Sequence, residues 1–244
     1  MIDISPLDRH ERIALCASGG KDSLAVLYLL RPYLHRLTVY HISTGDLLPE
    51  VDEIVRHVEA MAPNFVRVQT DAMGWIARHG LPTDLMPHSA HPVGQAMGEH
   101  GIRLVPRYEC CVQNLMQPLW DRIVADGRTL LIRGTKRADM KRLPLASGES
   151  DSGVELWLPI EDWSHDDVFA YLRSVGAPIC RVYQTTTNSP ECARCSAWWG
   201  ERRAEYLKRY HPDLWRDYSL RMRAVLAELW TPLQALNHEI EGCE

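Results

Sequence analysis

Residues 13–23 read IALCASGGKDS, an apolar run followed by a glycine pair and then by charged and hydroxyl side chains. The apolar residues predict a buried strand, and residues 24–28, LAVLY, predict the first turns of a helix. Two adjacent glycines let backbone N–H groups turn toward one point, where the following helix presents its positive end. The stretch therefore predicts a strand, a loop and a helix that together bind a phosphate, sulfate or pyrophosphate.

The side chains of this loop support the same interpretation. Lys21 contributes a mobile cation, and Ser18 and Ser23 contribute hydroxyl groups. The spacing differs from that of the Walker-type loop, whose two glycines are separated by four residues. A glycine pair alone would indicate an ordinary strand-to-helix turn, whereas the full string favours an anion site. The candidate binding residues are Ser18, Gly19, Gly20, Lys21, Asp22 and Ser23.

Composition places the chain among ordinary globular proteins. Its 244 residues are 45% hydrophobic and 24% charged, which is enough for an α/β core. The formal net charge of -5 argues against broad non-specific nucleic-acid binding. We expect a cytoplasmic protein without membrane contact, because no apolar run reaches membrane-spanning length and residues 1–6 do not resemble a signal peptide. Its seven cysteines then favour ligands or reactive thiols over disulfides.

The order of apolar patterns predicts an α/β fold with a doubly wound, mostly parallel sheet and a helical C-terminal region. Ser164 and Asp167 resemble a capping box at the start of one helix. Residues 156–159 look like an edge or terminal strand, because Pro159 cannot donate to a ladder. Residues 74–106 are poorly periodic and predict a long functional loop or a small excursion. The expected strands are residues 13–17, 37–42, 65–68, 130–132 and 156–159, and helical spacing covers residues 51–61 and 112–123.

Four cysteines in two pairs form the second signal. Cys110 and Cys111 are adjacent, and Cys192 and Cys195 form a CxxC pair about eighty residues later. A CxxC pair brings two thiolates to one metal centre, whereas adjacent cysteines cannot readily bridge each other. From the spacing alone an iron–sulfur cluster, a zinc site, a redox dithiol and coincidence all remain open. Cys16 and Cys180 have no such pattern, so we interpret them as core thiols.

The glycine loop resembles the PP-loop of the adenine-nucleotide α-hydrolase-like superfamily. That superfamily includes ATP pyrophosphatases, tRNA and DNA thiolation enzymes, and reductases of adenylyl sulfate (APS) and its 3′-phosphorylated form (PAPS). The spacing of the four cysteines resembles the iron–sulfur signature of assimilatory APS reductases. The resemblance implies a [4Fe–4S] cluster on Cys110, Cys111, Cys192 and Cys195.

Other segments resemble sulfonucleotide reductases in the same order. Residues 44–50, TGDLLPE, look like the family's nucleotide-contacting stretch, which implies contacts from Thr44, Gly45 and Glu50. Residues 133–137, RGTKR, look like a basic loop of the family, so Lys136 and Arg137 are implied to act on the polyanionic substrate. The further matching segments are residues 110–119, 159–168 and 189–195.

The chain departs from the family pattern in three places, one of which is Lys136, where the family's basic loop carries an Arg. Asn114 and Leu115 stand where family reductases carry an Arg-Lys pair. The chain ends in Glu-Gly-Cys-Glu, without the histidine that follows the family's tail cysteine, although Cys243 lies where that nucleophile would lie. On this resemblance we expect residues 1–199 to form the PP-loop nucleotide-binding domain with the iron–sulfur site. Residues 200–244 are then a helical extension and not an independent domain.

The resemblance implies a reductase that converts APS or PAPS to sulfite and AMP or its 3′-phosphorylated form. Cys243 would supply the thiolate and a thioredoxin-like protein would supply the electrons. One alternative is an ATP-dependent sulfur transferase that acts on tRNA or DNA and releases pyrophosphate. Another is a nucleotide-binding cluster protein without turnover. Substrate, sulfur acceptor and assembly into homo-oligomers stay open at this stage.

Overall fold

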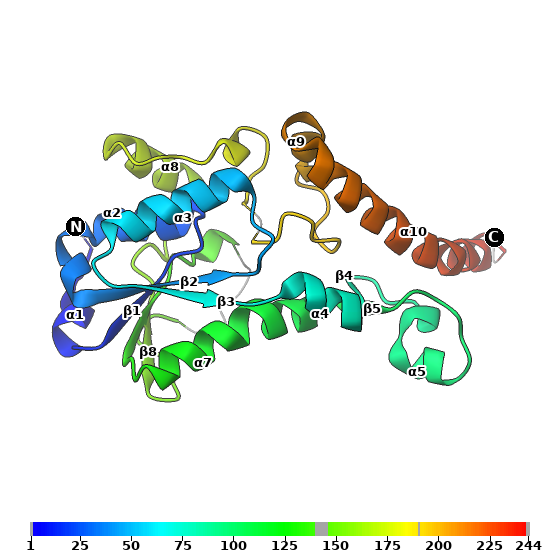
Figure 1. Cartoon of the computed structure of the whole chain (residues 1–244), viewed down its shortest axis with the longest axis horizontal. Helices are drawn as coiled ribbons and strands as arrows, with labels where there is room; N and C mark the ends of the chain where they lie inside the picture. The colour runs from blue at the N-terminus through cyan, green and yellow to red at the C-terminus, as the bar shows by residue number, and fades with distance from the viewer. Residues whose placement is uncertain (1, 140–145, 190, 243–244) are drawn as a thin grey trace. The chain divides into compact units, whose positions relative to one another are not determined.

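The computed structural model describes residues 2–139, 146–189 and 191–242 (Figure 1). The chain forms two compact units, each built from more than one stretch of sequence. Unit 1 comprises residues 1–43, 47–70 and 117–184, and unit 2 comprises residues 44–46, 71–116 and 185–244. This division does not coincide with the expected boundary after residue 199, because residues 71–116 and 185–244 belong to the same unit.

Unit 1 contains a six-stranded sheet in the order β3-β2-β1-β6-β8-β7. All neighbouring strands are parallel except β7, which pairs antiparallel with β8. The expected α/β fold with a mostly parallel sheet is therefore confirmed. Its strands are β1 (Ile13–Cys16), β2 (Leu37–Ser43), β3 (Phe65–Gln69), β6 (Leu130–Ile132), β7 (Ser150–Asp151) and β8 (Val154–Trp157).

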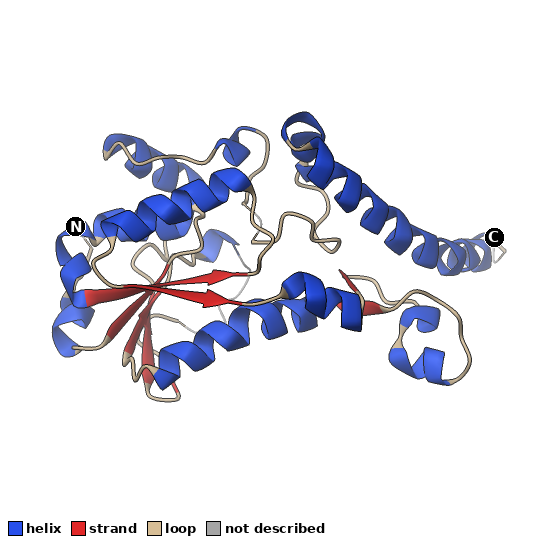
Figure 2. Ribbon diagram, viewed as in Figure 1, coloured by secondary structure: helices blue, strands red, loops and turns tan. Residues whose placement is uncertain are grey.

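Helices cover both faces of this sheet, with α2 and α3 on one side and α7 on the other (Figure 2). On the α7 side, Ile123 packs with Ala14, Leu131 and Leu156 of three neighbouring strands. Burial on both faces explains the nearly continuous apolar composition of the central strands. The helices of unit 1 are α1 (Ser5–Arg9), α2 (Lys21–Leu29), η1 (Arg31–Arg36), α3 (Pro49–Met61), α7 (Gln117–Ala125), η4 (Arg137–Asp139), α8 (His165–Ser174) and η5 (Arg181–Gln184).

Of two local predictions from the sequence, the capping box at Ser164 is confirmed and the edge strand at residues 156–159 is not. Ser164 begins α8 with a full capping box, in which its hydroxyl accepts from the Asp167 N–H and its own N–H donates to the Asp167 carboxylate. The edge position expected for residues 156–159 is wrong, because β8 has β6 on one side and β7 on the other. Pro159 lies beyond the end of β8 and therefore costs the ladder no hydrogen bond.

Unit 2 combines a short parallel pair of strands, β4 and β5, with helices. Residues 74–106, expected as a long loop or excursion, fold into several short elements, each too brief to leave a clear period in the sequence. The elements of unit 2 are α4 (Ala72–His79), β4 (Leu81–Thr83), η2 (His88–Ala90), α5 (Pro92–Ala96), β5 (Leu104–Pro106), α6 (Arg107–Cys111), the π-helix η3 (Val112–Met116), α9 (Arg203–Tyr210) and α10 (Pro212–Glu241).

Candidate functional site

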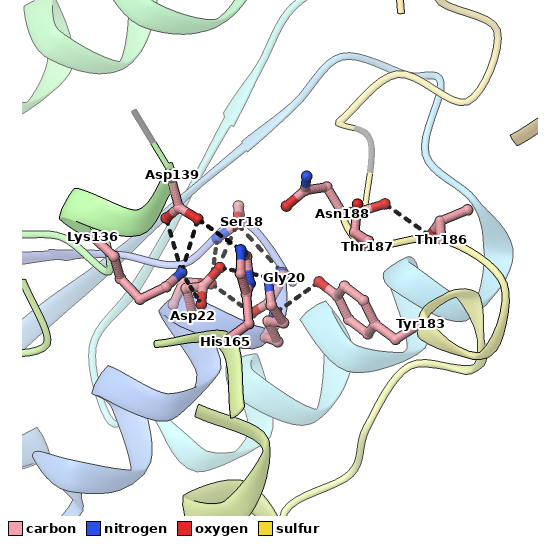
Figure 3. A network of polar contacts seen from close by, with 12 residues as sticks. Ser18, Gly20, Asp22, Lys136, Asp139, His165, Tyr183, Thr186, Thr187 and Asn188 are labelled. Atoms are coloured by element: carbon pink, nitrogen blue, oxygen red, sulfur yellow. Dashed lines mark hydrogen bonds and ion pairs between the residues drawn. The ribbon is translucent and has the colours of Figure 1, made fainter. Parts of the chain in front are cut away.

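The glycine loop lies between the end of β1 and the start of α2, as the sequence predicts. Gly20 is the N-cap of α2 and offers no side chain to the first helical N–H groups. Nearby hydroxyls take their place: the Gly20 N–H donates to Ser18 Oγ at 3.3 Å, and the Lys21 N–H donates to Tyr183 Oη at 2.8 Å (Figure 3). The loop thus carries helix-terminal donors whose partners are hydroxyl oxygens, the kind of acceptor that an anion oxygen replaces.

At two positions around this loop, neighbouring atoms lie so close to the backbone that only glycine fits. Gly19 has a positive φ of 85°, and a Cβ there would lie 2.9 Å from Cγ1 of Val51 in α3. A Cβ on Gly134, just after β6, would lie 2.6 Å from the backbone carbonyl carbon of Asp22. Because no side chain fits at either position, the loop and the first turn of α2 are held tightly against their neighbours.

Lys136 lies in an ion-pair network beside the loop (Figure 3). Its ammonium contacts Asp22 at 2.6 Å and Asp139 at 2.8 Å, and its side chain is fully buried. Lys21 contacts the other carboxylate oxygen of Asp22 at 3.0 Å. His165 lies 3.5 Å from Asp139 at the edge of the network. Two of the predicted basic residues, Lys21 and Lys136, therefore meet here, each paired to one oxygen of Asp22.

Arg137 and Glu50 lie elsewhere in unit 1. Arg137 is 63% exposed and pairs with Glu161 and with Asp162, the latter at 3.0 Å. Glu50, near the start of α3, is largely buried and has Arg181 at 3.7 Å. Arg137 is tied to two carboxylates in the present arrangement, so a contact with substrate would need a change of partners.

All four paired cysteines fall in unit 2, and Cys195 affects the pKa values of the other three. Burial raises the pKa of Cys110 to about 12, and repulsion from Cys111 and Cys195 adds to that rise. Burial also raises the pKa of Cys111, to about 11, again with a contribution from Cys195. The pKa of Cys192 is raised by burial and then by Cys195. Charge on Cys195 thus disfavours charge on each of the other three thiols.

Two polar side chains contact these sulfurs. Asn114, in the π-helical turn that follows Cys111, donates to the Cys110 carbonyl at 2.9 Å and lies 3.8 Å from Cys110 Sγ. The Thr44 hydroxyl lies 3.6 Å from Cys192 Sγ. Both side chains are buried. Asn114, which stands where the resembled family carries a basic residue, is therefore a direct neighbour of Cys110, a predicted metal ligand.

The segment 44–46 anchors the CxxC loop. The Ala193 N–H donates to the Asp46 carbonyl at 2.6 Å, and the Arg194 N–H donates to Asp46 Oδ2 at 3.0 Å. The Arg194 guanidinium closes the contact on Asp46 Oδ1 at 2.7 Å. Gly45 takes a positive φ of 77° between the two anchoring residues. Thr44 and Gly45, expected at the nucleotide, thus lie against the cysteine loop of unit 2.

The residues present fit a four-thiolate group in type, number and surroundings. The four thiols share one unit, and two of them have hydroxyl or amide neighbours of the kind that tune thiolate ligands. Within the described residues, no three His, Cys, Asp or Glu side chains are already close enough together to enclose an ion. Binding a metal group would therefore require the thiols to lose protons and converge.

The other three cysteines of the chain do not belong to the two cysteine pairs. Cys16 packs against the hydrophobic core of unit 1, and Cys180 is buried. Burial raises the pKa of each to about 11, which suits inert core thiols. Cys243, the predicted nucleophile, lies outside the described residues.

Sequence reasoning missed three residues of these sites: Tyr183, Asp46 and Asp139. The hydroxyl of Tyr183 reaches the loop from 162 residues away, which no local pattern indicates. In the sequence, Asp46 is one residue of the longer stretch 44–50 and has no signal of its own. Asp139 could have been found, since it follows the basic pair by two residues on the same turn.

Comparison with known families identifies one match over most of the chain. The model of the phosphoadenosine phosphosulfate reductase domain matches residues 12–198. An adenosine 5′-phosphosulfate reductase from Neisseria meningitidis is 31% identical over 195 residues, which cover 77% of this chain and 72% of the relative. None of the helices among the described residues combines the length and the apolar composition needed to cross a membrane.

Two solved structures also resemble the chain at low identity. One is a phosphoadenylyl-sulfate reductase from Candida auris in complex with phosphate, with 15% identity and a TM-score of 0.47 over 71% of this chain and 77% of that chain. The other is the U34-tRNA thiolase NcsA from Methanococcus maripaludis with its [4Fe-4S] cluster, with 19% identity and a TM-score of 0.48 over 85% of this chain and 70% of that chain.

Proposed function

The chain belongs to the phosphoadenosine phosphosulfate reductase family, and on that basis we propose that it is an iron–sulfur sulfonucleotide reductase. Its substrate is APS or PAPS, and its products are sulfite and AMP or the 3′-phosphorylated nucleotide. The observation that carries the proposal is that Cys110, Cys111, Cys192 and Cys195 all belong to the same unit, with Asn114 beside Cys110 and Thr44 beside Cys192.

The surroundings of the PP-loop support a sulfonucleotide over a nucleoside triphosphate. A triphosphate is usually bound with Mg²⁺, which is held through one or two carboxylates. Here Asp22 and Asp139 are both paired to Lys136, and Asp22 is also paired to Lys21. An ammonium therefore already neutralises the carboxylates next to the loop, which suits a substrate that binds through its own negative charge.

The reaction needs a thiolate and a dithiol. The Cys243 thiolate attacks the sulfate sulfur, the bond from that sulfur to the phosphate oxygen breaks, and AMP leaves with the electron pair. The cysteine then carries an S-sulfonate. A thioredoxin-like dithiol attacks the cysteine sulfur, sulfite leaves, and the donor closes to a disulfide as sulfate sulfur is reduced by two electrons.

Two contributions come from residues in the described part of the chain. The N–H groups of Gly20 and Lys21 and the lysine side chains bind and orient the anion. Cys110, Cys111, Cys192 and Cys195 would hold a [4Fe–4S] group, whose chemistry when bound is to organise charge at the leaving group.

An ATP-dependent sulfur transferase is the second candidate, and Asn114 is the observation that favours it. Family reductases carry a basic pair where this chain has Asn114 and Leu115. Asn114 is buried against Cys110. Because its amide side chain is neutral, it adds no positive charge for a sulfate group. Under this candidate the PP-loop binds ATP, activates an oxygen on tRNA or DNA, and releases pyrophosphate. A third candidate binds nucleotide without turnover.

One experiment separates the three candidates. Protein purified without oxygen is incubated in parallel with APS, PAPS and ATP, and sulfite, AMP and pyrophosphate are measured. Sulfite with APS or PAPS in the presence of a thiol donor supports the reductase. Cys243→Ser should abolish sulfite release while iron content and nucleotide affinity stay unchanged, and Cys180→Ser should change none of these. Pyrophosphate from ATP alone would establish the transferase, and binding without any product would establish the third candidate.

A further inference from the structure

Two arginines of unit 2 donate hydrogen bonds to the backbone of the CxxC loop. Arg203, at the start of α9, is only 6% exposed, and its guanidinium donates to the Cys195 carbonyl at 3.2 Å. Arg221, in α10, is half-buried, and its guanidinium donates to the Arg194 carbonyl at 3.4 Å. Two consecutive carbonyls at the end of the loop thus accept from positively charged donors.

Neither guanidinium is paired with a carboxylate in the part of the chain that the structure describes. Arg203 lies over the Trp198 ring, 5.3 Å from its centroid, and Arg221 contacts Met73 Sδ at 3.1 Å. A ring, a thioether and two carbonyls carry no net charge. Because a buried charge without an opposite charge is costly, both arginines call for an anionic partner.

The other arginines near the four thiols already have acidic partners. Arg194 pairs with Asp46 at 2.7 Å and with Asp217 at 2.9 Å. Arg107, whose charge acts on the neighbouring thiols, pairs with Asp84 at 2.8 Å. Neither of these groups therefore adds net positive charge around the thiols.

Two further acids make these surroundings more negative. Glu109 disfavours charge on Cys110, and Glu191 disfavours charge on Cys111. The two polar side chains that contact the sulfurs, an amide and a hydroxyl, are neutral. The two unpaired guanidinium groups therefore supply positive charge beside a set of thiols whose other neighbours do not.

Cys195 acts electrostatically on the surroundings of both arginines. Burial raises the pKa of Tyr218, and on the same phenol Arg203 lowers the pKa while Cys195 raises it. Burial and repulsion from Arg194 lower the pKa of Arg221, whereas negative charge on Cys195 opposes that shift. A thiolate at Cys195 thus favours the charged form of Arg221.

We propose that Arg203 and Arg221 balance the charge of the [4Fe–4S] group that the four cysteines would hold, an inference that rests on the proposed function. In its usual oxidised state such a core with four thiolate ligands carries a net charge of about −2, which two guanidinium groups match. Net charge and hydrogen bonding around the sulfurs set the stability and the reduction potential of the group. The two arginines therefore raise its potential and slow the loss of iron.

The first test measures iron retention in the full chain after reconstitution with ferrous iron and sulfide without oxygen. Arg203→Met and Arg221→Met keep an unbranched stem but remove the charge, so each should lose iron to a chelator about tenfold faster than wild type. Arg221→Lys keeps a positive charge and should retain iron better than Arg221→Met. Arg223→Met is the matched control, because Arg223 is exposed on the same helix, and it should behave like wild type.

Reduction potential is the second readout. A redox titration followed by electron paramagnetic resonance should give a lower potential in both methionine variants, because nearby cations stabilise the more negative reduced form. The melting temperature of the iron-free protein separates this role from a structural one. Removing an unpaired buried charge should leave the iron-free protein at least as stable as wild type, whereas removing a structural contact would lower its melting temperature.

Three results would overturn the inference. Iron retention and potential equal to those of wild type in both methionine variants would do so and leave the proposed function intact. Iron-free methionine variants that melt well below wild type, with no recovery of iron retention in Arg221→Lys, would assign the arginines a purely structural role. A wild-type protein that holds no iron would overturn the cluster and this inference together.

Discussion

Tyr183 illustrates how a single residue completes a backbone site. Its hydroxyl accepts the Lys21 N–H at 2.8 Å, and its ring lies 5.3 Å from the Lys21 ammonium. Phe169 of α8 holds the ring edge-on, with centroids 5.6 Å apart. The phenol oxygen therefore stands at a helix-terminal donor that an anionic ligand would use.

We expect Tyr183→Phe to tighten binding of APS and pyrophosphate by about threefold to tenfold. The variant keeps the ring packed on Phe169 but removes the competing acceptor, and a neutral hydrogen bond contributes about 0.5–1.5 kcal/mol. Titration calorimetry measures the affinities, with Tyr171→Phe on α8 as the control. Weaker binding in Tyr183→Phe would show instead that the phenol donates to the ligand.

His41 is the second informative residue, because it is buried in β2 and holds the backbone that enters the loop. Its Nδ1 lies 2.8 Å from the Ala17 carbonyl, so the neutral ring donates there. Burial lowers its pKa below the usual value; Arg67 lowers it further, while the hydrogen bond to Ala17 and the carboxylates of Asp52 and Glu59 oppose the shift. The folded protein thus resists protonation that the unfolded chain accepts.

The sign of the pH effect follows from this difference. Above the unfolded pKa of about 6.5 the stability is unaffected, and below it the unfolded state binds the extra proton, so stability falls as pH falls. Between pH 7.5 and 5.5 wild type should lose more unfolding free energy than His41→Asn, which donates to Ala17 without titrating. Urea denaturation at both pH values measures the difference, and equal losses would contradict the expectation.

At the scale of elements, the cysteine loop depends on its anchor as much as on its ligands. The buried Asp46 accepts from both the backbone and the guanidinium of Arg194, between the two cysteines of the CxxC pair. The same guanidinium contacts Asp217 of α10 at 2.9 Å, but that carboxylate is half exposed. The two aspartates thus bind the same arginine in very different surroundings.

We expect Asp46→Asn to lower the melting temperature and the iron retained after anaerobic reconstitution. Removing one partner of a buried charge pair costs about 3–5 kcal/mol, whereas an exposed pair contributes about 0–1 kcal/mol. Asp217→Asn should therefore change neither quantity measurably. Thermal denaturation of the iron-free protein tests the anchor separately from the cluster. Equal behaviour of the two variants would remove Asp46 from this role.

The elements also show where sequence reasoning succeeds and where it fails. Strands such as Leu130–Ile132 are apolar and bounded by turns, so their period and edges are visible in the sequence. The PP-loop and the cysteine pairs are short strings whose chemistry is local. Contacts such as Thr44 with Cys192 join residues that are 148 positions apart, and only the folded chain determines them. The same is true of Lys136, whose burial between two aspartates no local pattern predicts.

For the whole molecule, the division into units separates the two predicted chemistries. The PP-loop and the Lys136 network lie in unit 1, and the four thiols lie in unit 2. Each unit draws on distant stretches of sequence, so neither corresponds to a continuous fragment of the chain. Binding of an anion and binding of iron should therefore respond to different substitutions within the intact protein.

This separation gives a reciprocal test. In Gly20→Val, a Cβ would already lie 3.3 Å from both Ser18 Oγ and Tyr183 Oη, so the larger side chain should obstruct the approach of an anion to the loop. That variant should lose nucleotide binding and keep about four irons per chain, the number that a four-cysteine cubane holds. Cys195→Ser should lose iron and retain AMP binding. Calorimetry with AMP and iron analysis of both variants provide the measurements, and turnover should be absent in each. Loss of both properties in either variant would show that the two chemistries are coupled through the fold.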